Sequence, residues 1–143
     1  MGYYSNVAIA VSEPHFNEFK SYVDSWYQET IADNANEKTV RDAKATYDFI
    51  FKHSKIKKGE NPFVSSQADF IVIEWNNIKW YDCFPEVKMI MEHLVHKYPD
   101  ASFLRIGEEW DDVEEINNEF FWVDTSIGYD SYNYTSINIR TVD

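Results

Sequence analysis

The sequence predicts an α+β fold in which helices cover one face of an antiparallel sheet. Short runs of β-branched and aromatic residues alternate with longer segments whose apolar residues recur every three or four positions. The chain has 143 residues, of which 44% are hydrophobic, so it can bury a substantial core. It contains only four glycines and four prolines, and no repeat or linker divides it. We therefore expect one domain over residues 1–143.

The first strand and the first helix are expected within residues 6–31. Residues 6–11 are apolar and partly β-branched, which is typical of a buried strand. Ser12 or Glu13 is expected to cap the following helix, with Pro14 in its first turn, where a missing amide hydrogen costs nothing. The apolar residues of this segment share one helical face: Phe16, Phe19, Tyr22, Val23 and Trp26.

A second helix and a hairpin are expected next. The helix is predicted from Glu37 to about Lys55, and the basic tract 55–59 is interpreted as its last turn, followed by a glycine cap. Residues 70–75 and 78–80 are both rich in β-forming residues, and the two asparagines between them tolerate the left-handed geometry of a tight turn. These two runs therefore predict a β-hairpin.

The second half of the chain predicts one helix and three strands. Pro85 opens a helix that ends at about Pro99, and residues 102–106 predict a strand that Gly107 ends. The acidic segment 108–119 is expected to be a helix or a loop. Two further strands are predicted at 120–123 and 136–140.

The predicted order, with the helix at 37–55 treated as an insertion, starts with the split pattern β-α-β-β-α-β. This order predicts a ferredoxin-like antiparallel sheet with helices on one face, one inserted helix and a C-terminal β extension. The other face of the sheet is then either free to carry a function or covered by the C-terminal extension.

The negative charge of the chain is concentrated in its second half. The net charge is −12; residues 1–60 carry −1 and residues 61–143 carry −11. A protein that grips nucleic-acid phosphates shows the opposite bias, so direct nucleic-acid binding is not expected. No apolar run reaches the roughly 18 residues of a membrane span, and the N-terminus does not resemble a signal peptide. With a single cysteine, the chain is expected in the cytoplasm.

One acidic segment holds all of the candidate binding residues. Eight carboxylates and no lysine or arginine lie between residues 108 and 124, with aromatic residues interleaved. Three interpretations stay open: a solvated surface, a surface that imitates nucleic-acid phosphates and binds a basic partner, or a divalent-cation site. The expected partner-binding residues are Glu108, Glu109, Trp110, Asp111, Asp112, Glu114, Glu115, Glu119 and Asp124.

The sequence carries no motif that indicates catalysis. A Gly-x-Ser-x-Gly elbow, a glycine-rich phosphate loop and a calcium-binding EF-hand loop are all missing from it. Chance pairs of carboxylates are unavoidable at this acidity, so they do not indicate an acid–base pair. We therefore expect no enzyme activity, no cofactor and no metal site. The alternative is a small ligand-binding domain or enzyme with a pocket between the sheet and the C-terminal tail.

Three short motifs resemble those of a known group of proteins. They are Met-Gly-Tyr-Tyr-Ser at 1–5, Trp-Asn-Asn-Ile-Lys-Trp-Tyr at 75–81, and Phe-Leu-Arg-Ile-Gly-Glu at 103–108, which Asp111 and Asp112 follow. Together they resemble small, poorly characterised bacteriophage and prophage proteins with a ferredoxin-like core. Segment 33–62 has no counterpart in that group. The resemblance implies a phage origin and a fold, and it supplies no catalytic residues.

A small, acidic phage accessory protein suggests a function directed at the host. By analogy of charge and source with anti-restriction and anti-CRISPR inhibitors, we expect a counter-defence protein in the host cytoplasm. Its partner is expected to be a basic host protein that handles nucleic acid, and the acidic segment is the expected contact surface. A homo-oligomer is a further alternative, which exposed aromatic residues would support.

Overall fold

In the computed structural model, five strands form one antiparallel sheet and two more strands form a separate pair. The structure describes residues 2–32, 36–59, 69–109, 111–118, 120–125 and 135–139. The order of strands in the larger sheet is β2-β3-β1-β4-β5. The elements are β1 (Ser5–Ser12), α1 (Glu13–Ile31), α2 (Glu37–Phe51), β2 (Lys55–Gly59), β3 (Phe70–Ile78), α3 (Pro85–Ile90), the π-helical turn η1 (Met91–Val95), β4 (Ser102–Ile106), β5 (Val113–Ile116), β6 (Phe121–Thr125) and β7 (Thr135–Ile139).

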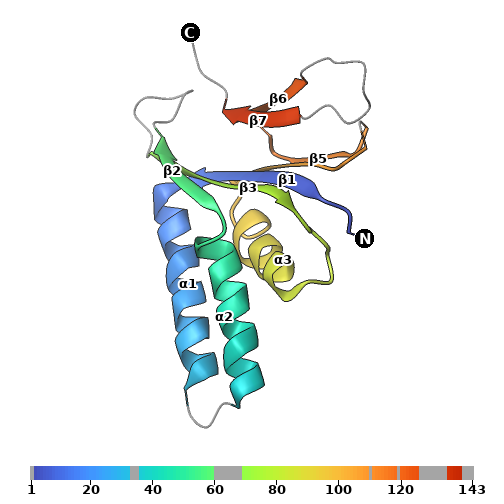
Figure 1. Cartoon of the computed structure of the whole chain (residues 1–143). Helices are drawn as coiled ribbons and strands as arrows, with labels where there is room; N and C mark the ends of the chain where they lie inside the picture. Colours follow the sequence, from blue (N-terminus) through green and yellow to red (C-terminus); the bar gives the residue numbers. More distant parts are fainter. Residues whose placement is uncertain are drawn as a thin grey trace.

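The predicted α+β class is confirmed, with the helices on one face of the sheet. Helices α1, α2 and α3 lie below the larger sheet in Figure 1, and the β6–β7 pair lies above it. Helices connect β1 to β2 and β3 to β4, while β5 adds an edge strand beside β4. The finer assignment to the ferredoxin-like group stays a prediction. None of the helices in the described part of the chain has the length and apolar character needed to cross a membrane.

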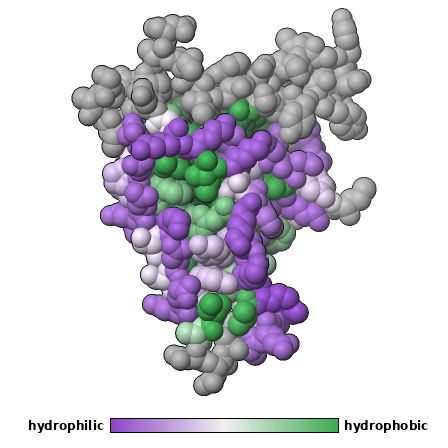
Figure 2. Space-filling view, turned by 60° about the vertical axis from the view of Figure 1, so that its left-hand side comes forward, coloured by the Kyte–Doolittle hydropathy of each residue, from purple (hydrophilic) through white to green (hydrophobic). Residues whose placement is uncertain are grey.

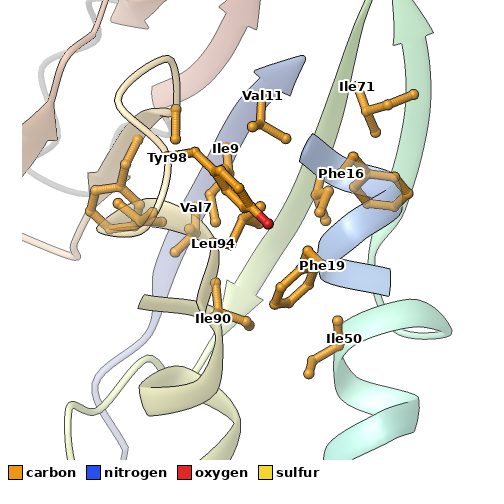
Figure 3. Packing of buried hydrophobic residues seen from close by; sticks show 14 of the residues in the cluster. Val7, Ile9, Val11, Phe16, Phe19, Ile50, Ile71, Ile90, Leu94 and Tyr98 are labelled. Carbon is orange, nitrogen blue, oxygen red and sulfur yellow. The ribbon is translucent and has the colours of Figure 1, made fainter. Parts of the chain in front are cut away.

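Strand β1 lies at the centre of the sheet because its side chains are apolar on both faces. Val7, Ile9 and Val11 point toward the helices, whereas Ala8 and Ala10 point toward β6–β7, and each is at most 1% exposed. The alternation follows from the two-residue period of a strand. Figure 3 shows the side chains that α1, α2 and the α3–η1 segment add to the core on the helical face: Phe16, Phe19, Ile50, Ile90 and Leu94.

The β6–β7 pair covers the second face of the sheet. Phe121 of β6 is fully buried there, and Phe120 and Ile137 pack against the same cluster. The small side chains of Ala8 and Ala10 allow this close approach. The sheet side of the cluster also contains Phe70, Val72, Leu104 and Ile106. The sequence left open whether this face of the sheet is free or covered by the C-terminal extension. The structure shows that it is covered.

Two polar contacts hold the α1–α2 pair and the sheet together. The Tyr47 hydroxyl on α2 donates a hydrogen bond to Asp24 of α1 at 2.8 Å. This bond, together with partial burial, raises the pKa of Tyr47 to about 12. The indole nitrogen of Trp75, on β3, donates to the backbone carbonyl of Phe49 at 2.8 Å. The sheet is therefore fixed against the helical layer by directional bonds as well as by apolar contacts.

The prediction for the basic tract was wrong, because helix α2 ends at Phe51 and residues 55–59 form strand β2. The Ser54 hydroxyl donates to the carbonyl of Ile50 at 2.7 Å, and the amide of His53 donates to the carbonyl of Asp48 at 2.8 Å, which closes the last turn. The tract then pairs with β3 from Lys55↔Glu74 to Gly59↔Phe70. Without β2, one row of backbone groups along β3 would lack hydrogen-bond partners.

The predicted hairpin was also wrong, because residues 70–78 form the single strand β3. Its pairing with β1 continues to Ser5↔Ile78, with a register shift between Ser5 and Val7. Asn77 has the positive φ expected of a turn residue, at 55°. Its amide donates to the side-chain oxygen of Asn6 at 2.8 Å, so the asparagines accommodate an irregularity of the strand and do not reverse the chain.

The predicted helix start at Pro85 and the three predicted strands of the second half are confirmed, and one prediction is corrected. Helix α3 begins at Pro85, and β4 spans 102–106. Strands β6 and β7, at 121–125 and 135–139, match the two predicted C-terminal strands to within a residue at most boundaries. The acidic segment, however, contains the short strand β5 and is neither a helix nor only a loop, because Val113–Ile116 pairs with β4.

Candidate functional site: the acidic edge

The candidate binding residues gather on the β4–β5 hairpin, at one end of the larger sheet. We call residues 107–116, apart from Trp110, the acidic edge. Its turn is closed by three backbone bonds, from Gly107 to Asp112 at 2.8 Å, from Asp112 to Glu109 at 3.0 Å and from Val113 to Asp111 at 3.1 Å. Strand β5 then pairs with β4 from Ile106↔Val113 to Phe103↔Ile116. The acidic side chains are therefore displayed by a hydrogen-bonded hairpin.

Arg105 of β4, which precedes the lysine- and arginine-free segment 108–124, neutralises part of the acidic edge. Its guanidinium donates to both carboxylate oxygens of Asp112, at 2.7 and 3.1 Å, and to Glu114 at 2.8 Å. It also donates to the Ser5 hydroxyl at 3.1 Å. The Arg105 side chain is only 14% exposed. Pairing in the sheet brings Arg105 directly opposite Glu114.

The pKa values of this cluster follow from these contacts. The hydrogen bonds that Arg105 and Tyr3 donate hold the pKa of Asp112 below its ordinary value. Burial works to lower the pKa of Arg105, but hydrogen bonds to Asp112 and Glu114 outweigh it, and the pKa is raised. The Asp112 carboxylate therefore stays charged to a lower pH than an unpaired aspartate does.

Tyr3 connects the N-terminus to the acidic edge. Its hydroxyl donates to Asp112 at 2.5 Å and accepts a bond from the backbone amide of Glu109 at 3.2 Å. Burial and the bond to Asp112 raise the pKa of Tyr3. The backbone amide of Tyr4 donates to Glu108 at 3.1 Å. These long-range contacts join residues about a hundred positions apart in the chain, which the sequence did not predict.

Gly107 is required where the turn begins. A Cβ atom at this position would overlap the Asp112 carboxylate and the Tyr3 hydroxyl. The absence of a side chain thus permits the contact between Tyr3 and Asp112. From its position after residues 102–106, Gly107 was predicted only to end the β4 strand.

Five carboxylates of the acidic edge remain exposed to solvent: Glu108, Glu109, Asp111, Glu114 and Glu115. Between residues 105 and 118, six carboxylates oppose one arginine, so the net charge of the hairpin is −5. Of the other predicted site residues, Trp110 and Glu119 lie outside the described residues. Asp124 belongs to β6, in the second sheet, and its side chain lies outside the description. The structure therefore brings together six of the nine predicted site residues.

Two of the aromatic residues interleaved with the acidic segment pack in the core. Phe121 is fully buried, and Phe120 lies against Phe70 with ring centroids 4.8 Å apart. Strand pairing puts Phe121 opposite Ile139 at the start of β6. The side chain of Trp122 is outside the description. Among the described residues, the acidic edge thus presents charge with little aromatic surface.

The alternative of a ligand pocket under the C-terminal tail stays a prediction. The described contacts between the larger sheet and β6–β7 are made by apolar side chains such as Leu104, Phe121 and Ile137. Among the described residues, these side chains offer no polar groups that would orient a ligand. Within the described ranges, no group of three or more histidine, cysteine, aspartate or glutamate side chains is arranged to hold a metal ion.

Comparison with known proteins returned no matching family model, no matching curated protein and no matching solved structure. The resemblance to bacteriophage and prophage proteins therefore stays an expectation from three short motifs. A function can therefore be inferred only from the residues of this chain. Among the described residues, the acidic edge is the best candidate site because both its geometry and its charge are defined.

Proposed function

We propose that this chain is a binding protein that inhibits a basic, nucleic-acid-handling host protein through the acidic edge. The main observation that supports this proposal is that five exposed carboxylates lie on one hydrogen-bonded hairpin. Carboxylates at a fixed surface attract a positively charged groove and speed the encounter with it. Because Arg105 and Tyr3 hold the hairpin from inside, little ordering is required when a partner binds.

The proposal includes a phage origin, which the three sequence motifs imply. It also includes action in the host cytoplasm, which is the expectation for a phage-encoded chain with a single cysteine. An inhibitor of this kind occupies the groove that would otherwise hold nucleic-acid phosphates. It is expected to act by keeping nucleic acid out of that groove, so no catalytic group is needed.

Charge reversal at three exposed positions tests the proposal. Glu109→Lys, Asp111→Lys and Glu115→Lys together change the charge of the acidic edge without removing the two carboxylates that contact Arg105. We expect a pull-down from host lysate with the native chain to capture basic proteins that high salt or added duplex DNA releases. The triple variant is expected to lose this capture, because its edge repels a basic groove.

A matched triple variant controls for net charge. Glu29→Lys, Asp42→Lys and Glu92→Lys change three exposed acids on the helices by the same total charge, and capture should persist. A captured protein is then purified, and its nucleic-acid binding is measured with and without the chain. Capture that survives reversal of the acidic edge, or a partner whose nucleic-acid binding is unaffected by the chain, would refute the proposal.

A further inference from the structure

The two outermost strands of the larger sheet carry opposite charges. Strand β2 is at one end of the sheet and β5 is at the other. Lys55, Lys57 and Lys58 are exposed along β2, and we call this strand the basic edge. Glu114 and Glu115 are exposed along β5, within the acidic edge. Each outer strand also has a row of backbone groups that no other strand in the described part of the chain pairs with.

Each of these two strands also exposes one aliphatic side chain. Ile56 of β2 is 39% exposed and Val113 of β5 is 43% exposed. Figure 2 turns the side of the molecule that carries β2 forward and shows hydrophobic surface bordered by hydrophilic side chains there. An aliphatic side chain between charged ones on an unpaired strand is suited to cross-strand contact with a second strand.

We propose that copies of this chain associate edge to edge, with β2 of one copy pairing with β5 of the next. Charge decides this choice of edges. Two β2 strands would bring lysines together and two β5 strands would bring glutamates together, and like charges directly opposite each other destabilise a strand pair. Only the β2–β5 junction places cations opposite carboxylates. The inference goes beyond the proposed function, although the acidic edge takes part in both.

The topology fixes how the faces meet in an antiparallel junction. Neighbouring strands are antiparallel throughout the larger sheet, so β2 and β5 of one copy run in the same direction. An antiparallel β2–β5 junction therefore turns the second copy over. The helical face of the first copy then continues as the β6–β7 face of the second.

One register of this junction matches side chains on both faces. Ile56 lies on the helical face because it pairs with Ile73, and Val113 lies on the opposite face because it pairs with Ile106. When the second copy is turned over, these two aliphatic side chains meet. Lys55 then stands opposite Glu114, and the acids of the turn, Asp112 and Asp111, approach Lys57 and Lys58.

The ion pairs within one copy do not prevent the lysines of β2 from contacting the acids of a second copy. Lys57 contacts Glu74 at 3.4 Å, and Lys58 contacts Glu13 at 3.0 Å, while the two lysine side chains are 52% and 57% exposed. Exposed pairs of this kind contribute little to stability, so the lysines can contact a second copy at small cost.

The symmetry of the junction predicts the kind of assembly. Because different edges of the two copies meet, each copy keeps one unpaired edge, and growth continues into a chain or closes into a ring. The contact area of two short strands is small, so the association should be weak, concentration-dependent and sensitive to salt.

The test uses one substitution on each edge: Ile56→Glu and Val113→Lys. Both side chains are substantially exposed, and neither forms one of the ion pairs described above. Sedimentation velocity over a range of protein concentrations at low salt should show the native chain associating. Each variant alone should associate about tenfold more weakly, because a charged group replaces the aliphatic contact. An equimolar mixture of the two should recover association, because the carboxylate introduced on β2 of one chain then meets the ammonium group introduced on β5 of the other.

Ala45→Glu and Ala45→Lys are the matched controls, since they introduce the same charges at an exposed position on α2 and should associate as the native chain does. Circular dichroism verifies that each variant is folded. A native chain that stays monomeric at every concentration would overturn the inference, as would variants that associate normally or a mixture that does not recover.

Failure of this inference can be distinguished from failure of the proposed function. Ile56→Glu leaves the acidic edge intact, so it should lose self-association but retain capture of a basic host protein. If the native chain is monomeric while the triple lysine variant loses capture, only the edge-to-edge inference fails. If self-association behaves as expected while capture survives the triple reversal, only the proposed function fails.

Discussion

Arg105 divides the carboxylates of the acidic edge into two groups. Asp112 and Glu114 accept its hydrogen bonds and hold β5 against β4, whereas Glu109, Asp111 and Glu115 are exposed on the same hairpin. Acidic residues of the same hairpin thus differ in role, since some hold the hairpin together and others face solvent. The sequence identified the acidic segment but could not distinguish the two groups, because the distinction depends on which carboxylates the strand pairing places beside Arg105.

Replacing Asp112 tests the structural group. Asp112→Asn should lower the free energy of unfolding at neutral pH by about 1–3 kcal/mol, because hydrogen bonds to a charged group are lost and the buried part of Arg105 keeps only Glu114 as an acidic partner. Urea denaturation followed by fluorescence measures this change. Asp111→Asn, in the same turn but exposed, is the control and should cost well under about 1 kcal/mol.

The loss of stability caused by Asp112→Asn should depend on pH. The pKa of Asp112 is lower in the folded chain than its ordinary value of about 3.9, so its contribution is complete above that value and is lost as the pH falls through the folded pKa. The stability difference between native chain and Asp112→Asn should therefore shrink in acid. A difference that stays constant below about pH 4 would contradict the assigned role of this carboxylate.

At the scale of elements, the basic tract shows how local signals misled the prediction. Lysines after a helical pattern, followed by Gly59, are typical of a helix C-terminus. The actual helix end is marked by Ser54, whose hydroxyl bonds back to Ile50, and the lysines belong to a strand. Alternation of Lys55, Ile56 and Lys57 was the available signal, but three residues are too few to separate the two periods.

The order of elements as far as α3 was nevertheless predicted correctly, through two errors that compensated, whereas β5 was not predicted. The sequence predicted two strands from 70–75 and 78–80, whereas the structure has β2 at 55–59 and one long β3 at 70–78. The number of strands between α2 and α3 is the same in both cases. The asparagines at 76 and 77 suggested a turn, but pairing with β1 keeps the strand extended.

The turn of the acidic edge depends on Gly107, and Gly107→Ala tests that dependence. The added Cβ would overlap Asp112 and Tyr3, so their contact must shift, and we expect a loss of about 1–3 kcal/mol in the free energy of unfolding. Denaturant titration measures it. In a Tyr3→Ala background the cost of Gly107→Ala should be smaller, because one of the two overlaps is removed. An equal cost in both backgrounds would show that Tyr3 does not restrict this position.

At the scale of the whole molecule, the larger sheet is buried on both faces by different layers. The helices cover one face with large side chains, and β6–β7 covers the other around Phe121. Tyr3, near the N-terminus, instead contacts the acidic edge, at one end of the sheet. The acidic and basic edges are the remaining ends of the sheet, which neither layer covers with a further strand in the described ranges.

Truncation of Phe121 tests how much the second layer contributes. Phe121→Ala should destabilise the chain by about 3–5 kcal/mol, because it removes a fully buried aromatic side chain and leaves a cavity against Leu104 and the alanines of β1. Thermal and urea unfolding measure the loss. Tyr4→Ala, at a side chain that is 36% exposed, is the control and should cost far less. Similar costs for the two variants would indicate that β6–β7 is not part of the cooperative core.

The sequence alone determined the α+β class, the first strand, the first helix and the concentration of negative charge between residues 108 and 124, because hydrophobic period and charge are local properties. Only the tertiary structure decided that Lys55–Gly59 is an edge strand, that Arg105 neutralises Asp112 and Glu114, and that opposite charges lie on the two outer strands of one sheet. These features arise from pairing between residues distant in the chain, and a short stretch of sequence does not specify which strand it will pair with.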